Sequence, residues 1–454
     1  MRIIGFLIGI CFFANVCFAA EPVTNEQLFE EVRSLKAIVS AQQQKINELE
    51  KKITLQTTPT QPVKVEEARL DDLERRLDSY IDERLEKKYP GSEIMKDLEL
   101  GIGLTGVVQG THNANSDSLP FKKDVVDASY SIDLTFLKKF DDYGQAFVHL
   151  EQGNGQGVEP HLKVFSNVNR DADSDNNVRA TEVWYEHYFS PKNIPLTITA
   201  GKLDPTIYID DNAYANDENS QFLGRMFRNS PAIEFPENSG ALRLGYELGE
   251  IADFNALALN GNADWDNTFD GMFFAGQVNF QPKLFSREGN YRILGWYNDQ
   301  NHTKWLDTTE DKKKGYGFGL SFDQEIMDSS GLFARYGWQN PKVYLNSASD
   351  FSLEQSYSMG AQFKGNLWGR SNDIVGLAFG QTFPSNDYKK AGAELSSVRK
   401  ADPENHLEFY YKLAVNKHLF LSPDLQVIWN PYGNDAINGD STITVGGMRA
   451  HVEF

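Results

Sequence analysis

The sequence predicts an all-β fold, a sixteen-stranded antiparallel transmembrane β-barrel, preceded by an α-helical coiled-coil stalk. Three observations predict it. Apolar and polar residues alternate over sixteen segments after residue 97, and the connections between these segments alternate between long and short. A heptad pattern occupies the region before residue 57. The alternating segments suit tilted strands that cross a bilayer, which need about 9–11 residues each.

The first twenty residues, "MRIIGFLIGICFFANVCFAA", have the organisation of a secretory signal peptide, assigned to residues 1–19. Arg2 precedes an apolar run over 3–13 that is too short for a spanning helix, and Cys17 and Ala19 stand at −3 and −1 of a cleavage site. Both cysteines of the chain, Cys11 and Cys17, lie in this segment. The mature protein is therefore expected to contain no disulfide and no cysteine-ligated zinc.

Two coiled-coil helices are predicted after the signal peptide. The first, over residues 24–56, carries an apolar seam in alternating steps of four and three: Leu28, Val32, Leu35, Val39, Gln42, Ile46, Leu49 and Ile53. A single amphipathic helix packed on a core is the alternative, which the narrow stripe disfavours. Residues 57–66 form a proline-containing linker, and the second helix, over 67–90, ends at Pro90.

From residue 97 to 454 the apolar period is two, which indicates strands. In "LELGIGLTGVVQ", for example, Leu98, Leu100 and Ile102 alternate with polar or small residues. The predicted strands are 98–109, 128–137, 144–151, 179–189, 195–202, 241–248, 253–260, 272–280, 290–298, 315–325, 331–339, 355–365, 372–382, 406–415, 419–429 and 442–454.

The connections between these strands distinguish a membrane barrel from a soluble β-protein. The long ones are 110–127, 152–178, 203–240, 261–271, 299–314, 340–354, 383–405 and 430–441, and a short one lies between each long one and the next. Long loops on one side, short turns on the other and an even strand number are typical of bacterial outer-membrane barrels. The terminal Phe454 is similar to the C-terminal aromatic residue of proteins assembled into that membrane. The chain is therefore expected in the outer membrane of a Gram-negative-type bacterium, in contact with its lipid.

Charged residues recur at the inward positions of the predicted strands, which predicts a water-filled interior rather than a packed core. Acidic residues come from the second to fourth strands and basic residues from later strands, so a transverse field across the pore is expected; each charge could instead be a solvated wall residue without selectivity. The predicted lumen-wall residues are Asp133, Glu151, Glu182, Glu186, Arg243, Arg335, Lys364, Lys412 and Arg449.

Composition and motifs argue against several other functions. The net charge of −20 disfavours a nucleic-acid partner. Zinc-protease, nucleophile-elbow and phosphate-loop motifs are missing from the sequence, so an enzyme is not expected, and no cofactor is. One calcium-like spacing occurs in "DADSDNNVRATE", where oxygen-bearing residues occupy positions 1, 3, 5, 7 and 12 of a Ca²⁺ loop. These are Asp171, Asp173, Asp175, Asn177 and Glu182, and a solvated acidic loop is the alternative.

The stretch "GKLDPTIYIDDNAYANDENSQFL", from Gly201 to Leu223, resembles the signature of the carbohydrate-selective (OprB-like) porins. "PAIEFPENSGALRLGYEL" and "LSPDLQVIWNPYGND" continue the resemblance, which covers about residues 98–454. Ile209 departs from the aromatic residue usual in the family, which questions a stacking contact with a sugar. The matching positions are Gly201, Lys202, Asp204, Asp210, Asn212, Ala215, Asn216, Asp217, Glu218, Gln221 and Phe222.

The resemblance implies a passive diffusion channel for small hydrophilic solutes, sugars or small ions, assembled as a homotrimer. The coil sequence itself favours a dimeric coiled coil in isolated peptides, which disagrees with a trimer. We expect the trimer, because the barrels bring the larger interface. The coil would lie in the periplasm. The alternative function is a structural tether, in which the barrel anchors a coil that reaches the cell wall and the pore is narrow or closed.

The connection 203–240 would be the third long loop, which in sixteen-stranded porins generally folds inward and narrows the channel. Three prolines would stiffen it, and Tyr208, Tyr214, Phe222, Phe227 and Phe235 could pack on the inner wall. Its carboxylates outnumber its arginines by seven to two, Glu234 and Glu237 included, which predicts a preference for cations. The predicted constriction residues are Asp204, Asp210, Asp211, Asp217, Glu218, Arg225 and Arg228.

Overall fold

The computed structural model describes residues 96–116, 123–172, 175–189, 195–284, 286–346, 352–394, 398–438 and 441–454. The predicted signal peptide, both coiled-coil helices and the linker lie outside the described residues.

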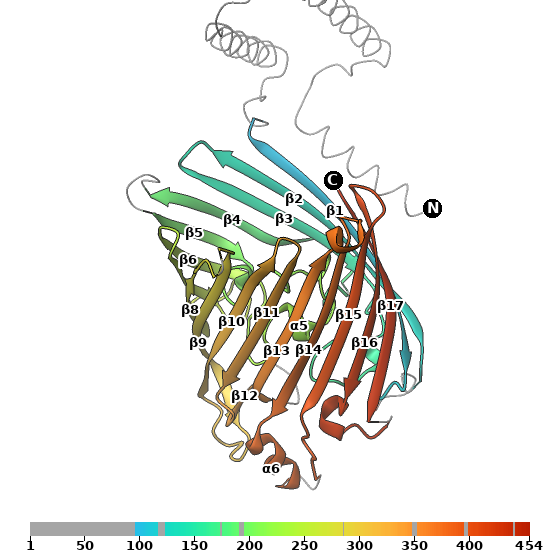
Figure 1. The fold of residues 1–454 in the computed structure, drawn as a ribbon. Coiled ribbons are helices and arrows are strands. Elements are labelled where there is room, and N and C mark those ends of the chain that lie inside the picture. The colour runs from blue at the N-terminus through green and yellow to red at the C-terminus, as the bar shows by residue number, and fades with distance from the viewer. Residues whose placement is uncertain are drawn as a thin grey trace, which may run out of the picture. The chain divides into compact units, whose positions relative to one another are not determined.

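Sixteen strands form one closed antiparallel ring (Figure 1). Each strand pairs with the next along the chain, and β1 closes the ring by pairing with both β2 and β17. The strands of the ring are β1 Leu98–His112, β2 Val126–Phe140, β3 Gly144–Asn154, β4 Arg179–Phe189, β5 Leu196–Leu203, β6 Ser239–Leu248, β7 Ala252–Asn260, β8 Met272–Phe280, β9 Gly289–Lys304, β10 Lys313–Met327, β11 Ser330–Gln339, β13 Leu353–Lys364, β14 Ile374–Pro384, β15 Glu404–Ala414, β16 Leu419–Trp429 and β17 Thr442–Glu453.

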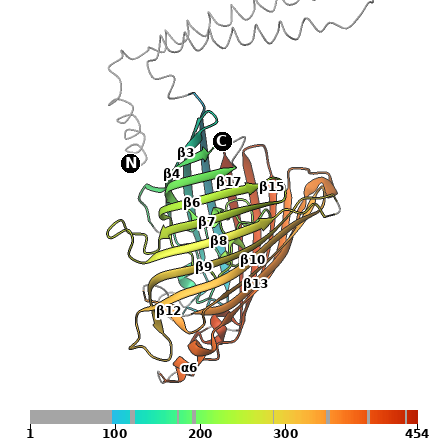
Figure 2. The same ribbon diagram turned by 90° about the vertical axis from the view of Figure 1, so that its left-hand side faces the viewer.

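Further elements lie in the connections. The three-residue strand β12 (Val343–Leu345) pairs with the end of β9 and belongs to a loop rather than to the ring. Helix α5 (Arg225–Arg228) lies inside the ring of strands, whereas α6 (Asn386–Glu394) lies at the long-loop end (Figures 1 and 2). Short 3₁₀ turns occupy Glu159–His161, Pro205–Ile207, Gly365–Trp368 and Pro431–Asn434.

The prediction of a sixteen-stranded barrel is confirmed, strand by strand. The largest difference is in β9, which extends to Lys304 because its far end pairs with β10 and with β12 beyond the predicted strand. Long and short connections alternate as predicted. Large apolar side chains are exposed on the outer face, for example Leu100, Ile102 and Leu104 on β1, as a lipid-facing wall requires.

The interior contains packed apolar clusters beside its polar wall residues, more than the pattern of inward charges predicted. Inward side chains of the wall form three apolar clusters with residues from two long connections. Apolar side chains at inward positions, such as Phe273 and Phe333, gain from being removed from water, and the loops provide the cover. Among the described residues, no helix is both long enough and apolar enough to span a membrane.

Candidate functional site

The connection between β5 and β6, residues 204–238 and here called loop 3, folds into the barrel. Leu203 and Ser239 pair across the neck of the loop, so both of its ends leave the wall at one point. Ile209 and Ile233 of loop 3 are buried against inward wall residues that include Phe273. This packing explains the departure at Ile209, whose side chain is fully buried and faces the wall rather than a solute.

A second apolar cluster fixes the middle of loop 3. Phe222, Met226 and Phe227, on and before α5, are buried with the wall residues Phe333 and Tyr410. The Phe222 and Tyr410 rings meet edge to face, with centroids 4.9 Å apart. The predicted packing of the loop aromatics on the inner wall is therefore confirmed.

Asp210 does not line the channel, which corrects the prediction for this residue. Its side chain is fully buried, 3.3 Å from the guanidinium of Arg335 on β11. Its carboxylate accepts a hydrogen bond from the backbone N–H of Ser230 at 2.7 Å, and its φ of 65° is one that Asp tolerates better than most residues. Burial raises the pKa of Asp210, although the Arg335 charge opposes that change. Asp210 therefore links Ser230, in the later part of loop 3, to Arg335 on the wall.

Two more wall arginines hold loop 3. Arg292 on β9 lies 2.9 Å from a carboxylate oxygen of Asp211. Arg449 on β17 donates to the backbone carbonyls of Glu218 and Gln221 at 2.6 and 2.8 Å. Arg335 and Arg449, predicted as lumen-wall residues, project inward, and loop 3 covers both side chains.

Arg228 organises the acidic residues at the start and middle of loop 3. Its guanidinium forms ion pairs with Asp204, at 3.5 Å, and with Glu218. Asp204 also accepts from the backbone N–H of Thr206 at 2.8 Å, so it caps the turn at Pro205, a structural role typical of Asp. Asp217 is half-buried, and its carboxylate accepts from the backbone N–H of Asn219.

The connection between β3 and β4, residues 155–178 and here called loop 2, also folds inward, which sequence analysis missed. Val158 and Val168 are buried against Ile428, Ile443 and Val445 of β16 and β17. The apolar residues of this loop follow no regular period and stand among polar ones, so they were too weak a signal to predict this path; they include Val158, Leu162, Val164, Phe165 and Val168.

Loops 2 and 3 meet through two backbone hydrogen bonds. The N–H of Arg170 donates to the carbonyl of Leu223 at 2.8 Å, and the N–H of Arg225 donates to the carbonyl of Asn167 at 3.2 Å. Among the described residues, the guanidiniums of Arg170 and Arg225 have no ion-pair partner, and both side chains are exposed. The depth of Arg225 inside the barrel, with the positive charges of Arg170 and Arg228, lowers the pKa of Arg225 to about 10. It therefore stays charged at neutral pH.

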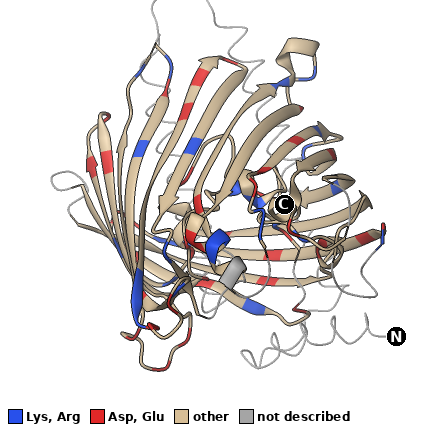
Figure 3. Cartoon of the chain, turned by 90° about the horizontal axis from the view of Figure 1, so that it is seen from below, with Lys and Arg blue, Asp and Glu red and all other residues tan. Residues whose placement is uncertain are grey.

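The other predicted wall residues point inward as expected but are largely engaged. Glu186 and Arg243 form an ion pair at 3.0 Å. Asp133 lies 2.9 Å from the imidazole of His149, and Glu182 accepts from the indole of Trp184. Glu151 and Lys412 are half-buried, and Lys364 is exposed at the end of β13. Acidic and basic residues both occur around the ring and within it (Figure 3); the transverse field stays a prediction.

The calcium spacing stays a prediction as well, because Asp173 lies outside the described residues. Its companions have separate partners: Asp171 accepts from Ser131, and Asp175 lies 3.6 Å from Arg179. The described part of the chain contains no group of three or more His, Cys, Asp or Glu residues that could hold a metal ion.

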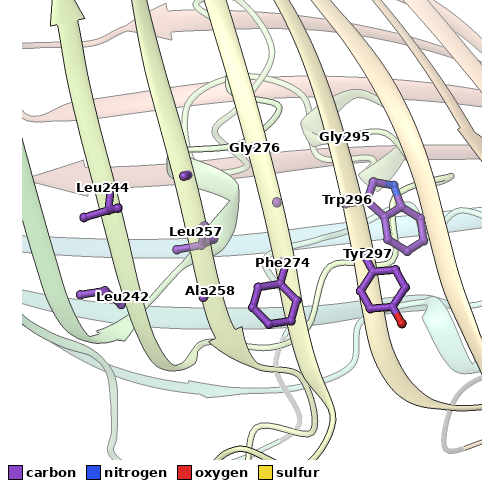
Figure 4. Close-up of a pocket in the computed structure, with 11 residues that line it drawn as sticks. Leu242, Leu244, Leu257, Ala258, Phe274, Gly276, Gly295, Trp296 and Tyr297 are labelled. Carbon is purple, nitrogen blue, oxygen red and sulfur yellow. The ribbon is translucent and has the colours of Figure 1, made fainter.

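A groove of about 520 Å³ on the wall formed by β6 to β9 is not part of this site (Figure 4). Leu242, Leu244, Phe274 and Tyr297 line it and are exposed, whereas the inward neighbour Trp296 is covered by loop 3. The groove therefore opens on the outward face of the barrel.

Comparisons with known proteins agree with this geometry. Residues 122–454 match the family model "Carbohydrate-selective porin, OprB family". Porin B of Pseudomonas aeruginosa is 21% identical over 285 residues, covering 54% of this chain and 62% of that protein. An uncharacterized protein of Aquifex aeolicus is 23% identical over 231 residues, covering 51% of this chain and 59% of its own. The chain thus matches about three fifths of the length of these curated relatives.

The fold has a solved counterpart. A high-pH structure of OprB from Pseudomonas putida superposes with a TM-score of 0.68 at 16% sequence identity, covering 81% of this chain and 97% of that one. The family match spans most of the barrel, including both inward loops and the strands that hold them. The chain belongs to the OprB family of carbohydrate-selective porins.

Proposed function

We propose that this protein is an outer-membrane porin through which small neutral hydrophilic solutes, sugars among them, diffuse passively, with loop 3 as its constriction. The observation that supports the proposal is the packing of loop 3 on the inner wall, through two apolar clusters and three wall arginines. A loop held at so many points inside a barrel narrows the path that a solute can take. An enzymatic function has no support from the family or the fold.

The polar groups of the two inward loops, exposed Arg170 and Arg225 and half-buried Asp217 and Glu218, suit a polyhydroxylated solute. Arg170 and Arg225 offer guanidinium donors that have no ion-pair partner among the described residues. Asp217 and Glu218 offer carboxylate acceptors. Because every hydroxyl of a sugar both donates and accepts, a path with both kinds of group can replace part of its hydration shell.

A preference for cations belongs to the proposal, but it is smaller than sequence analysis predicted. Six arginines within or contacting loop 3 face its seven carboxylates: Arg170, Arg225, Arg228, Arg292, Arg335 and Arg449. These arginines offset part of the negative charge of loop 3, although the wall carboxylates Glu182, Asp323 and Glu408 also contact the loop backbone, and buried Asp210 contributes little to an ion's path. Asp217 and Glu218 are the carboxylates that would carry the preference.

Assembly is a further part of the proposal. Three barrels would associate as a homotrimer, with the N-terminal coils in the periplasm, where they could reach the cell wall. Family membership supports the trimer, whereas the heptad seam supports only the coil and by itself favours two strands. Native mass spectrometry of the mature protein should show a trimer, and a dimer would contradict it.

Planar-bilayer recordings and liposome swelling test the proposed channel. Open single-channel conductance and swelling in monosaccharide solutions are expected. A silent lumen would instead favour the alternative, a barrel that mainly anchors the coil. Asp217→Asn combined with Glu218→Gln should shift the zero-current potential in a salt gradient toward anions, whereas the matched pair Asp264→Asn and Asp266→Asn, in an exposed outer loop, should not.

A further inference from the structure

Four successive inward residues of β15 are fully buried beneath the inward loops: Glu404, His406, Glu408 and Tyr410. Two of them are carboxylates, which are rarely buried without strong partners. Neither has an ion-pair partner among the described residues, and both have backbone N–H groups of loops as hydrogen-bond donors. The strand therefore acts on the loops through directed hydrogen bonds as well as through packing.

Glu404 binds two connections at once. One carboxylate oxygen accepts from the backbone N–H groups of Phe165, at 2.9 Å, and Tyr432, at 2.7 Å. The other accepts from Ser166 at 3.2 Å. Phe165 and Ser166 belong to loop 2, whereas Tyr432 follows β16. Glu404 thus fixes loop 2 only a residue before Asn167, which accepts from Arg225.

Glu408 binds loop 3 in the same way. Its two oxygens accept from the backbone N–H groups of Leu223, at 2.6 Å, and Gly224, at 3.0 Å. The contact is so close that a Cβ on Gly224 would lie 2.7 Å from a Glu408 oxygen. The carbonyl of Leu223 in turn accepts from Arg170.

His406 lies between the two carboxylates and has a polar link of its own. The side-chain amide nitrogen of Gln426 donates to the carbonyl of Val168 and to Asp424, so its oxygen is left to accept from His406 Nε2, 2.9 Å away. Val168 belongs to loop 2. The inward face of β15 and its neighbour β16 therefore hold loop 2 on one side of the junction and loop 3 on the other.

A carboxylate suits this task because both of its oxygens accept hydrogen bonds. The N–H groups of Leu223 and Gly224 are buried in a loop without a regular backbone partner, and a buried N–H left unpaired loses its hydrogen bond to water without a replacement. Glutamine has a single side-chain acceptor and would present an N–H₂ group to one of the two donors. Replacing Glu408 therefore disturbs the junction while leaving the strand ladder unchanged.

We propose that Glu404 and Glu408 are positioning residues of the constriction: they hold loops 2 and 3 as one unit and so fix Arg170 and Arg225 on the solute path. The inference rests on the proposed channel function and adds to it the wall residues that set the geometry of the constriction. It predicts that the effect of Arg225 on permeation depends on Glu408, although the two side chains do not form an ion pair.

A double-mutant comparison in planar bilayers tests this dependence with the full-length protein. Arg225→Ala is measured in the wild type, in Glu408→Gln and in Asp253→Asn. Asp253 is the matched control, because it is an inward wall carboxylate whose partners are strand and wall side chains. Arg225→Ala should shift the zero-current potential toward cations in the wild type and in Asp253→Asn. In Glu408→Gln the shift should fall to less than half.

The outcomes separate the two proposals. A full Arg225→Ala shift retained in Glu408→Gln would overturn the positioning role and leave the channel intact. No Arg225→Ala shift in the wild type would overturn the proposed constriction itself. Gly224→Ala keeps every charge but displaces the same contact, so it should also weaken the Arg225→Ala shift, and it provides the test if Glu408→Gln fails to assemble. Heat-modifiable mobility on gels checks that each variant retains its barrel.

Discussion

Loop 3 and the connection between β14 and β15 are both long and both contain buried aromatic residues, yet they lie in different places. Loop 3 buries its aromatic residues inside the barrel, whereas the second connection, residues 385–403, forms α6 at the rim (Figure 1). There Tyr388 is buried against Trp305, with ring centroids 5.1 Å apart, and the Arg399 guanidinium lies 3.9 Å from the Tyr388 ring centroid. Both loops are therefore ordered by apolar packing.

The difference lies in where each loop finds its partners. Behind loop 3 the wall presents apolar side chains at inward positions, among them Phe273, Trp296 and Phe333. The partners of Tyr388 are Trp305 and Tyr344, which belong to neighbouring connections rather than to inward wall positions. Loop 3 packs inside the barrel because the inner wall presents apolar side chains to it. The connection between β14 and β15 packs at the rim because neighbouring connections present them.

Deleting each loop in turn should show the largest difference between them, measured as the change in single-channel conductance. Replacing residues 206–236 by a short Gly-Ser turn keeps the Leu203–Ser239 pairing at the neck and should raise single-channel conductance several-fold. Deleting α6, residues 386–394, should leave conductance within experimental error. Equal conductance changes from the two deletions would show that loop 3 has no special place on the solute path.

Replacing one buried aromatic residue in each loop tests the same difference, with a smaller expected change in conductance. Phe227→Ala and Tyr388→Ala each remove a fully buried ring, which costs about 3–5 kcal/mol of local packing. Limited proteolysis should therefore detect loosening in both variants. Only Phe227→Ala should change the mean conductance and its fluctuation, because only its loop lies inside the ring. A conductance change in Tyr388→Ala of the same size would argue against the distinction.

The packing of loop 2 should depend on pH, with a smaller effect on the channel current than the changes above. Burial raises the pKa of Glu159 to about 7, against the opposing hydrogen bonds from Val168 and Asn169. Because the packed loop holds this proton more tightly than an unpacked one, its packing is strongest below the ordinary carboxyl pKa and weakens as pH rises through about 7. Current fluctuation should therefore grow between pH 5 and pH 8, a range chosen around the folded pKa. Glu159→Gln should flatten that dependence, and a variant with the wild-type pH profile would exclude Glu159 as its cause.

The strands could be predicted because inward and outward positions alternate residue by residue, as at Tyr130 and Ser131. The inward fold of loop 3 could be predicted from its aromatic residues together with the family resemblance. Burial of individual charges could not, since Asp133 and Glu408 occupy equivalent inward positions in the pattern and only the path of a loop decides which is covered. For the same reason the pattern predicts neither the burial of Asp210 nor the place of Arg170 beside loop 3.

Chemical modification of a single cysteine tests the central claim, that loop 3 borders the solute path. The chain has no cysteine after residue 17, so Arg225→Cys and Lys390→Cys, on exposed α6, form a matched pair. Both should react with a charged methanethiosulfonate reagent. We predict a stepwise fall in single-channel current when Arg225→Cys reacts and no change when Lys390→Cys does. Complete modification of Arg225→Cys with an unchanged current would contradict the account.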